Sequence, residues 1–275
     1  MCERVLDILF IGDIVGRPGR KAVCRYLNDI KNTEPPDFVI ANVENASHGF
    51  GLTFRNHEEL KSYGINAFTS GNHIWDKKEI FEYINTSDVL IRPLNYPNCD
   101  FGVGYRIFEV KGVRLCLINL LGRTFMTPVD SPFDVLKNAM PELKEKADIF
   151  IADFHAEATA EKICMAYFAK DLGINAVLGT HTHVQTADEQ IMDNMFYITD
   201  VGFCGAKNSV IGMDVTTSIK RLLTCLPERY EIEADNEAQL NAVRLKFDIS
   251  SKSCMSIERI FCDKKLSEEK DMKGS

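Results

Sequence analysis

The stretch VLDILFIGD, residues 5–13, sets a pattern that recurs along the chain. Its apolar run, Val5–Ile11, is typical of a buried strand, and the run stops at a glycine followed by the carboxylate of Asp13. Ligands of open α/β sheets bind beyond the carboxyl ends of the strands. Asp13 thus lies where a ligand-binding residue is expected, although a single Asp after a glycine is more often a turn or helix-cap residue.

Four later apolar runs stop in the same way. The polar stretches at their ends are Glu44-Asn45, Gly71-Asn72-His73, Asp153-Phe154-His155 and His181-Thr182-His183. Each of these groups alone has an ordinary interpretation as a turn, a solvated loop or a structural histidine. Together, five strands would direct carboxylate, carboxamide and imidazole groups at one region of the molecule, which is far less expected by chance.

Two of the six histidines lie one residue apart in GTHTH, residues 179–183. Period-two spacing predicts that both side chains point to one face of an extended segment. A metal site, a catalytic pair and a half-buried strand all fit this pair when it is considered alone. Protonated imidazoles on one face would repel each other, whereas neutral imidazoles share metal ions well.

Helical patterns alternate with the apolar runs over most of the chain. One predicted helix opens at Pro18, and the others cover residues 54–63, 77–84, 133–146, 158–171 and 214–224. Predicted strands beyond the first cover 38–43, 67–69, 89–91, 149–154, 176–178 and 196–198, a hairpin of 104–110 with 113–120, and an antiparallel pair of 243–249 with 255–261. This alternation predicts one α/β domain with two packed mixed sheets over residues 1–262, followed by a charged, frayed tail over 263–275.

Composition excludes several classes of protein. The net charge of −8 argues against a general electrostatic grip on nucleic acid or anionic membrane. No apolar run approaches the roughly 20 residues that cross a bilayer, and the first residues lack the features of a signal peptide. The nine cysteines are odd in number and widely spaced, which favours free thiols in a reducing cytoplasm over a disulfide framework.

The strand-end residues have the chemistry of a metal site without thiolates. The candidate ligands are Asp13, Glu44, Asn45, Asn72, His155, His181 and His183. Oxygen and nitrogen donors suit Mn, Fe, Zn or Mg rather than a structural zinc site rich in cysteine. Seven ligands are too many for one ion, so two ions that share a carboxylate are expected. Two divalent cations would also draw a phosphate group into an acidic protein.

Two rival phosphate-binding motifs fail. Gly12, Gly16 and Gly19 open a strand-to-helix turn, but their spacing differs from the G-x-G-x-x-G of dinucleotide-binding proteins. No Gly-Lys-Ser/Thr follows, so a P-loop is also excluded. Asp200 in TDVG has two interpretations, a residue that positions the loop near the site and, as the more ordinary one, a strand-end turn residue.

The motifs together resemble the calcineurin-like metallophosphoesterases and, within them, the bacterial YmdB-like subgroup. The matching segments are FIGDIVGRPGR (10–20), ANVENASHGFGLT (41–53), SGNHIWD (70–76), ADFHAEATAEK (152–162), GTHTHVQTADEQI (179–191) and YITDVGFCG (197–205). The broad family usually has Asp-x-His at its first site and a bridging Asp. Here Val15 stands where that histidine would be, and Glu44 with Asn45 replaces the bridging Asp, which is the pattern of the subgroup.

The resemblance implies a four-layer αββα sandwich of two mixed sheets and a pair of divalent ions, Fe or Mn foremost, with Zn or Mg as alternatives. It implies that Asp13, Glu44, Asn45 and His183 hold one ion. Glu44, Asn72, His155 and His181 would hold the other, with Glu44 as the bridge. A homo-oligomer is a further implication of the family.

The resemblance also implies phosphodiesterase activity, notably on 2′,3′-cyclic nucleotides, by attack of a hydroxide that bridges the metals. His73 would face the phosphate and protonate the leaving oxygen or stabilise the transition state, and an imidazole is a suitable general acid. A structural histidine on a turn is the plain alternative for His73. Two other functions stay open: a regulatory protein that binds nucleotides or RNA-related partners without turnover, and a di-metal amidohydrolase.

Overall fold

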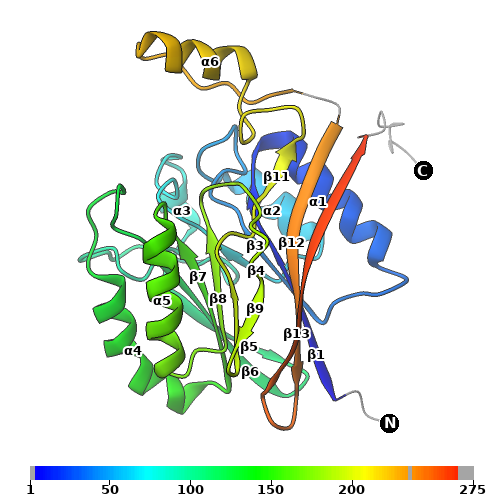
Figure 1. The fold of residues 1–275 in the computed structure, drawn as a ribbon, viewed down its shortest axis with the longest axis vertical. Coiled ribbons are helices and arrows are strands. Elements are labelled where there is room, and N and C mark those ends of the chain that lie inside the picture. Colours follow the sequence, from blue (N-terminus) through cyan, green and yellow to red (C-terminus); the bar gives the residue numbers. More distant parts are fainter. Residues whose placement is uncertain (1–3, 235–236, 266–275) are drawn as a thin grey trace.

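Strand β1, Val5–Ile11, is buried on both faces from Ile8 onwards, and this double burial explains why its sequence is apolar apart from Asp7. Leu6 and Ile8 point into a core between two sheets, whereas Leu9 and Ile11 point into a second core beneath helices. The computed structural model describes residues 4–234 and 237–265. In it, β1 lies near the centre of one of the two sheets (Figure 1).

The sheet that contains β1 has seven strands in the order β2-β11-β12-β1-β3-β4, with β13 paired to β12. Its other strands are β2 Asp13–Ile14, β3 Phe38–Asn42, β4 Ala67–Thr69, β11 Phe203–Ala206, β12 Glu237–Asp248 and β13 Cys254–Lys265. Strands β1, β3 and β4 run parallel, and β12 runs antiparallel to β1. The carboxyl ends of the three parallel strands therefore meet at one edge of the sheet.

The second sheet has six strands in the order β5-β6-β7-β8-β10-β9. Its strands are β5 Tyr105–Val110, β6 Val113–Leu121, β7 Ile149–His155, β8 Ala176–Thr180, β9 Gln190–Met192 and β10 Met195–Ile198. The four inner strands are parallel, and an antiparallel strand flanks them on each side. The carboxyl ends of β7 and β8 lie at the same edge of this sheet.

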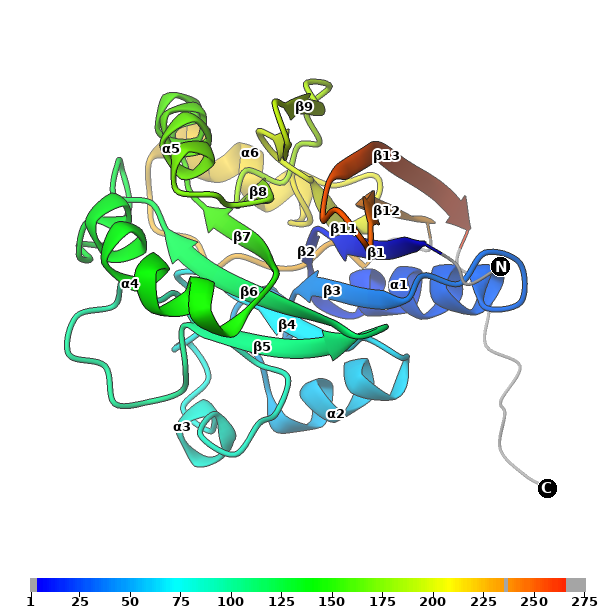
Figure 2. The same cartoon turned by 90° about the horizontal axis from the view of Figure 1, so that it is seen from below.

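Helices cover the outer faces of both sheets, as the two views show (Figures 1 and 2). The helices are α1 Gly16–Ile30, α2 Phe54–Ser62, α3 Ile80–Tyr83, α4 Pro132–Lys146, α5 Thr159–Asp171 and α6 Val215–Thr224. Helices α1 to α3 pack on the seven-stranded sheet, and α4 and α5 pack on the six-stranded sheet. A third core lies between the sheets. Three cores separate four layers, which confirms the αββα sandwich.

Several predicted boundaries were wrong. Helix α1 begins at Gly16 rather than at Pro18, because a proline is tolerated throughout a first turn whose N–H groups have no helical partner. The predicted strand 89–91 makes only a single parallel bridge, between Leu90 and Phe68. Strands β2, β9 and β11 were not predicted, since each is only two to four residues long.

The C-terminal antiparallel pair is confirmed, and it is longer than predicted. Strand β13 pairs with β12 up to Lys265, so regular structure continues past the boundary predicted at residue 262. The rest of the predicted tail, residues 266–275, lies outside the described residues and stays a prediction. Among the described residues, no helix is long and apolar enough to cross a membrane, and no disulfide is formed.

Candidate metal centre

The predicted ligands converge at the edge where the carboxyl ends of both sheets meet. The oxygen ligands follow strands of the seven-stranded sheet: Asp13, Glu44, Asn45 and Asn72. The nitrogen ligands end or follow strands of the six-stranded sheet: His155, His181 and His183. Each of these residues makes at least one contact with another member of the set. The centre therefore spans the two sheets, and each sheet contributes one type of donor atom.

One half of the centre gathers around His155. Its Nε2 lies 3.0 Å from Glu44 Oε1, 3.0 Å from His181 Nδ1 and 3.2 Å from Asn72 Oδ1. Burial alone would lower the pKa of His155, but the charge of Glu44, followed by that of Asp13, outweighs it and raises the pKa to about 9. A positive charge is therefore favoured at this point. The donor atoms of Glu44, His155 and His181 lie within 4.8 Å of one another, as metal ligands must.

The other half gathers around His183. Its Nδ1–H donates to the carbonyl oxygen of Ile211 over 2.9 Å, so Nε2 keeps its lone pair for the site. Nε2 lies 3.1 Å from Asn45 Nδ2 and 3.8 Å from Asp13 Oδ1. Burial lowers the pKa of His183, so its imidazole is held neutral, which is the form that binds metal.

Two buried oxygens of this half lack hydrogen bonds among the described residues. They are Oδ1 of Asp13 and Oδ1 of Asn45. A buried acceptor without a partner costs about 1–3 kcal/mol, so native proteins rarely leave one unsatisfied. Burial also raises the pKa of Asp13, because nothing in the chain compensates fully for its desolvation. A cation would satisfy both oxygens, and the residues present therefore fit a metal.

Glycine is required beside the centre at position 71. A Cβ on Gly71 would lie 2.3 Å from Glu44 Oε2 and 2.4 Å from His155 Nε2, which is closer than atoms can approach. Any side chain here would displace two ligands at once. The glycine in GNH therefore makes room for the centre, rather than serving only the turn.

The extended geometry predicted for His181 and His183 is wrong. Strand β8 ends at Thr180, and the two histidines have φ of +100° and +62°, in the left-handed region. They consequently do not share one face of a strand. His181 turns its Nδ1 towards His155, whereas His183 turns towards Asn45, so each histidine serves a different half of the centre.

Asp200 holds the loop that carries these two histidines. Its Oδ2 accepts hydrogen bonds from the backbone N–H and the hydroxyl of Thr182, at 3.1 and 2.7 Å, and lies 2.7 Å from Lys162 Nζ. Lys162 and Asp200 are both almost fully buried. Of the two interpretations of Asp200, these contacts favour the residue that positions the loop over the simple turn residue, because its partners are distant in sequence.

We expect Asp200→Ala to lower the free energy of unfolding by about 3–5 kcal/mol, since Lys162 becomes a buried charge without its partner. We also expect kcat/KM to fall about 10–100-fold, as is usual when a residue that supports metal ligands is lost. Urea unfolding and steady-state kinetics measure the two effects. The double variant Lys162→Met/Asp200→Ala should recover stability but not activity. Recovery of both would show that Asp200 does not position the loop.

His155 is oriented by residues that the sequence did not single out. Its Nδ1 lies 2.9 Å from the hydroxyl of Thr180, and that hydroxyl donates to Asp153 Oδ1 over 2.6 Å. Asn42 Nδ2 donates to Asp153 Oδ2 over 3.0 Å. Nδ1–H of His155 is thereby committed to Thr180, and Nε2 faces the ligands. The only signal in the sequence was Asp153, a polar residue inside the otherwise apolar strand that ends at His155.

His73 lies beside the ligands without joining them. Its backbone N–H donates to Glu44 Oε2 over 3.0 Å, and its Nδ1 lies 2.9 Å from Asp76 Oδ2. The ring also packs edge-on against Phe50, with centroids 4.8 Å apart. Asp76 holds one ring nitrogen, so Nε2 is left to act on a substrate. The role of His73 towards the leaving oxygen stays a prediction.

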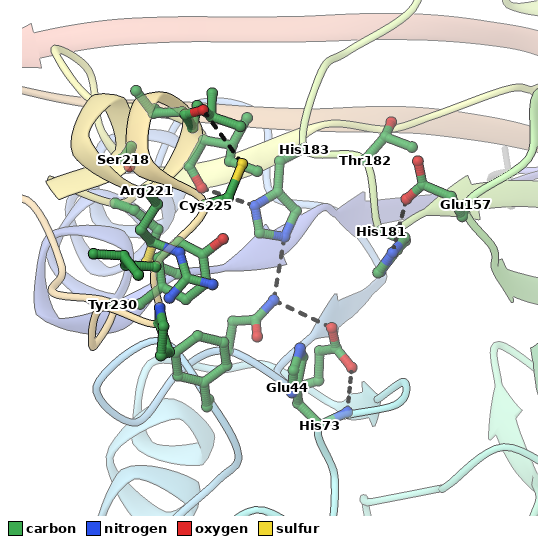
Figure 3. A pocket seen from close by; sticks show the side chains of 18 residues that line it. Glu44, His73, Glu157, His181, Thr182, His183, Ser218, Arg221, Cys225 and Tyr230 are labelled. Atoms are coloured by element: carbon green, nitrogen blue, oxygen red, sulfur yellow. Dashed lines mark hydrogen bonds and ion pairs between the residues drawn. The ribbon is translucent and has the colours of Figure 1, made fainter. Parts of the chain in front are cut away.

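A cavity of about 800 Å³ opens in front of the centre. Its lining on one side includes Glu44, Asn45, His73, His181 and His183. Figure 3 shows the side chains of Glu44, His73, His181 and His183 around a common space. The opposite side is formed by the segment 207–233, which contains α6 and is called the arm below. No motif in the sequence pointed to the arm.

Comparison with known proteins agrees with this geometry. The model of the family described as YmdB-like protein matches residues 9–260. A 2′,3′-cyclic-nucleotide 2′-phosphodiesterase of Bacillus subtilis (strain 168) is 44% identical over 256 residues, which cover 93% of this chain and 96% of that protein.

Two solved structures have the same fold. A hypothetical protein of Thermus thermophilus is 39% identical with a TM-score of 0.87, over 94% of this chain and 99% of that one. A novel phosphatase of Mycoplasma pneumoniae is 35% identical with a TM-score of 0.89, over 96% of this chain and 95% of that one. Because the family model and these relatives span nearly the whole sequence, the chain belongs to the YmdB-like family.

Proposed function

We propose that this protein is a metal-dependent phosphodiesterase that opens the 2′-ester bond of nucleoside 2′,3′-cyclic phosphates. The observation that carries the proposal is the convergence of the seven candidate ligands, two of them with an unsatisfied buried oxygen, beside a cavity that four of the seven and His73 line. The name of the Bacillus subtilis relative supports the substrate class and the choice of the 2′ bond.

Two divalent ions would be held in the arrangement that the family implies. Asp13, Asn45 and His183 belong to one site, Asn72, His155 and His181 to the other, and Glu44 to both. This donor set suits Fe or Mn, with Zn or Mg as alternatives. When bound, such ions supply positive charge to the phosphate oxygens and a water that ionises at neutral pH.

The chain's own residues orient the substrate and move the proton. His73 carries a proton on Nε2 and gives it to O2′ as the phosphorus–O2′ bond breaks. The oxygen of a water molecule forms the new bond to phosphorus, so the product is a nucleoside 3′-phosphate. Asp76 fixes the ring of His73 through Nδ1, which keeps Nε2 directed into the cavity.

Metal removal tests the proposal. We expect a chelator to abolish hydrolysis of 2′,3′-cAMP and Mn²⁺ or Fe²⁺ to restore it. Because the ions bind the folded state, stability should also fall on chelation, by about 2.7 kcal/mol where the free metal had been about 100 times its Kd. Elemental analysis, calorimetry and product chromatography give the three measurements.

Two outcomes would contradict the proposal. Metal-loaded protein that cleaves neither 2′,3′-cAMP nor bis-p-nitrophenyl phosphate is not a phosphodiesterase. Tight binding of 2′,3′-cAMP without turnover would instead favour the regulatory binding protein, and cleavage of amides in place of phosphodiesters would favour the amidohydrolase.

We also propose a cytoplasmic location, a homo-oligomeric assembly and no stable binding of nucleic acid. The net charge of −8 supports the last of these. Helix α6 exposes Leu222 and Leu223, which are 81% and 80% accessible, and contact between copies of the chain would cover such side chains.

A further inference from the structure

The cavity has two chemically different sides. The metal side is polar and carries all of the groups that act on a phosphate. The arm side is largely apolar and includes Ile211, Met213, Leu222 and Leu226. Figure 3 shows Arg221 and Tyr230 together on this side, across the cavity from His181. Hydrolysis of a phosphodiester does not by itself require this second side. The arm side is therefore available to contact a part of the substrate other than the phosphate.

Two side chains of the arm, together with Phe50 from the loop after β3, form a connected π surface. The guanidinium carbon of Arg221 lies 3.9 Å from the ring centroid of Tyr230, and Arg221 Nη1 donates to the carbonyl oxygen of Glu228. The ring of Phe50 lies 6.1 Å from that of Tyr230, at an interplanar angle of 46°. Phe50, Arg221 and Tyr230 are called the platform below.

The platform is continuous with the catalytic groups. Phe50 contacts Tyr230 on one side and His73 on the other, at 6.1 and 4.8 Å between centroids. The arm is also fixed to the centre directly, because the carbonyl of Ile211 accepts the Nδ1–H of His183 over 2.9 Å. The ring of Phe50 therefore lies between the imidazole of His73 and the ring of Tyr230, and the platform begins directly beside the proposed proton donor.

We propose that Phe50, Arg221 and Tyr230 form the nucleobase subsite of the enzyme and make it select nucleoside cyclic phosphates over diesters that lack a base. Aromatic rings and guanidinium groups stack on nucleobases, and stacking tolerates every base because each has a π face. Tyr230 is 43% accessible, so part of its ring is open to such a ligand. This inference rests on the proposed phosphodiesterase function.

The test compares 2′,3′-cAMP with methyl riboside 2′,3′-cyclic phosphate, which has the same reacting ring and no base. In Tyr230→Ala, the ratio of kcat/KM between the two substrates should fall about 5- to 150-fold, the range expected for one lost base–aromatic stack, mainly through a higher KM for 2′,3′-cAMP. Calorimetry should show weaker binding of the product, adenosine 3′-phosphate, by a similar factor.

Two further variants complete the test. Tyr230→Phe keeps the ring and should keep the substrate ratio near that of the wild type. Ile219→Ala changes a residue on the same arm that is 51% accessible and is not among the residues that line the cavity, so it should have no effect on the ratio. Melting temperatures verify that each variant is folded.

The outcomes separate this inference from the proposed function. If Tyr230→Ala lowers kcat/KM for both substrates equally, the platform supports folding and the subsite is overturned, while the phosphodiesterase stands. An unchanged ratio with unchanged rates overturns the subsite as well. If wild-type enzyme cleaves neither substrate, the proposed function fails first and the subsite fails with it.

Discussion

Glu44→Gln is expected to reduce kcat for 2′,3′-cAMP by well over 100-fold. The loss of a residue that only supports a metal ligand reduces activity by at most about 100-fold. Glu44 has three tasks, and glutamine preserves its shape but not its charge. Oε1 lies 3.0 Å from His155 Nε2 and accepts from Asn45 Nδ2 over 3.2 Å, while Oε2 accepts the N–H of His73. The substitution therefore disturbs both halves of the centre and the proton donor together.

The charge of Glu44 is the part that glutamine removes. Burial by itself would raise the pKa of Glu44, but His155, with a smaller contribution from His73, outweighs it and holds the pKa well below its usual range. Glu44 is thus ionised at neutral pH, although the residue is only 1% accessible. A buried neutral amide at this position would offer an ion no charge, so the metal content of the variant should fall along with its rate.

Elemental analysis of the purified variant, together with kcat at saturating Mn²⁺, measures this prediction. The matched control is Glu142→Gln, which changes an exposed carboxylate that pairs with Lys146 on the surface of α4. It should retain wild-type metal content and rate. If Glu44→Gln bound two ions and kept its activity, Glu44 would not be the shared ligand.

His73→Gln is expected to lower kcat for 2′,3′-cAMP by about 10²- to 10⁴-fold, the usual contribution of a general acid. The ribose oxygen is a poor leaving group and needs a proton as its bond to phosphorus breaks. In bis-p-nitrophenyl phosphate the leaving group is already a stable anion, so the same variant should lose much less activity. The variant should keep its metal content, because His73 donates a hydrogen bond to Glu44 only through its backbone N–H, which glutamine retains.

The comparison between leaving groups decides the role of His73. Equal losses with both substrates would mean that the imidazole stabilises the phosphate in the transition state rather than protonating the leaving oxygen. Asp76→Asn is the companion variant, since the Asp76 carboxylate contacts the far nitrogen of the ring, at 2.9 Å. It should cause a smaller loss than His73→Gln with the same dependence on the leaving group.

The two packed sheets and the gathering of the candidate ligands in one region could be predicted because both depend on local patterns, whereas the four layers were implied by the resemblance to the family. Apolar runs such as Val5–Ile11 identify buried strands, and parallel strands necessarily bring their carboxyl ends to one edge. Asp13 and Glu44 could therefore be placed in one region although they belong to different strands. The resemblance to the family then divided the candidate ligands into two groups, and this division stays a prediction, since Asp13 Oδ1 lies 3.8 Å from a ring nitrogen of both His155 and His183.

Other features could not be predicted because they arise from tertiary contacts. The left-handed conformation of His181 and His183 depends on how Asp200 holds Thr182, and nothing within GTHTH encodes it. Arg221 and Tyr230 belong to no motif, and only the path of the arm brings them to the cavity. Short pairings such as β2 with β11 have too few residues for a periodic signal.

The division of donor atoms between the sheets constrains how the enzyme matures. A chain whose sheets have formed but have not yet docked offers oxygen atoms in one place and imidazoles in another, and neither partial set can complete a coordination shell. If two ions bind as proposed, their uptake would be completed only after the sheets have docked. The bound ions would then link the two sheets, and their release would require the sheets to separate locally.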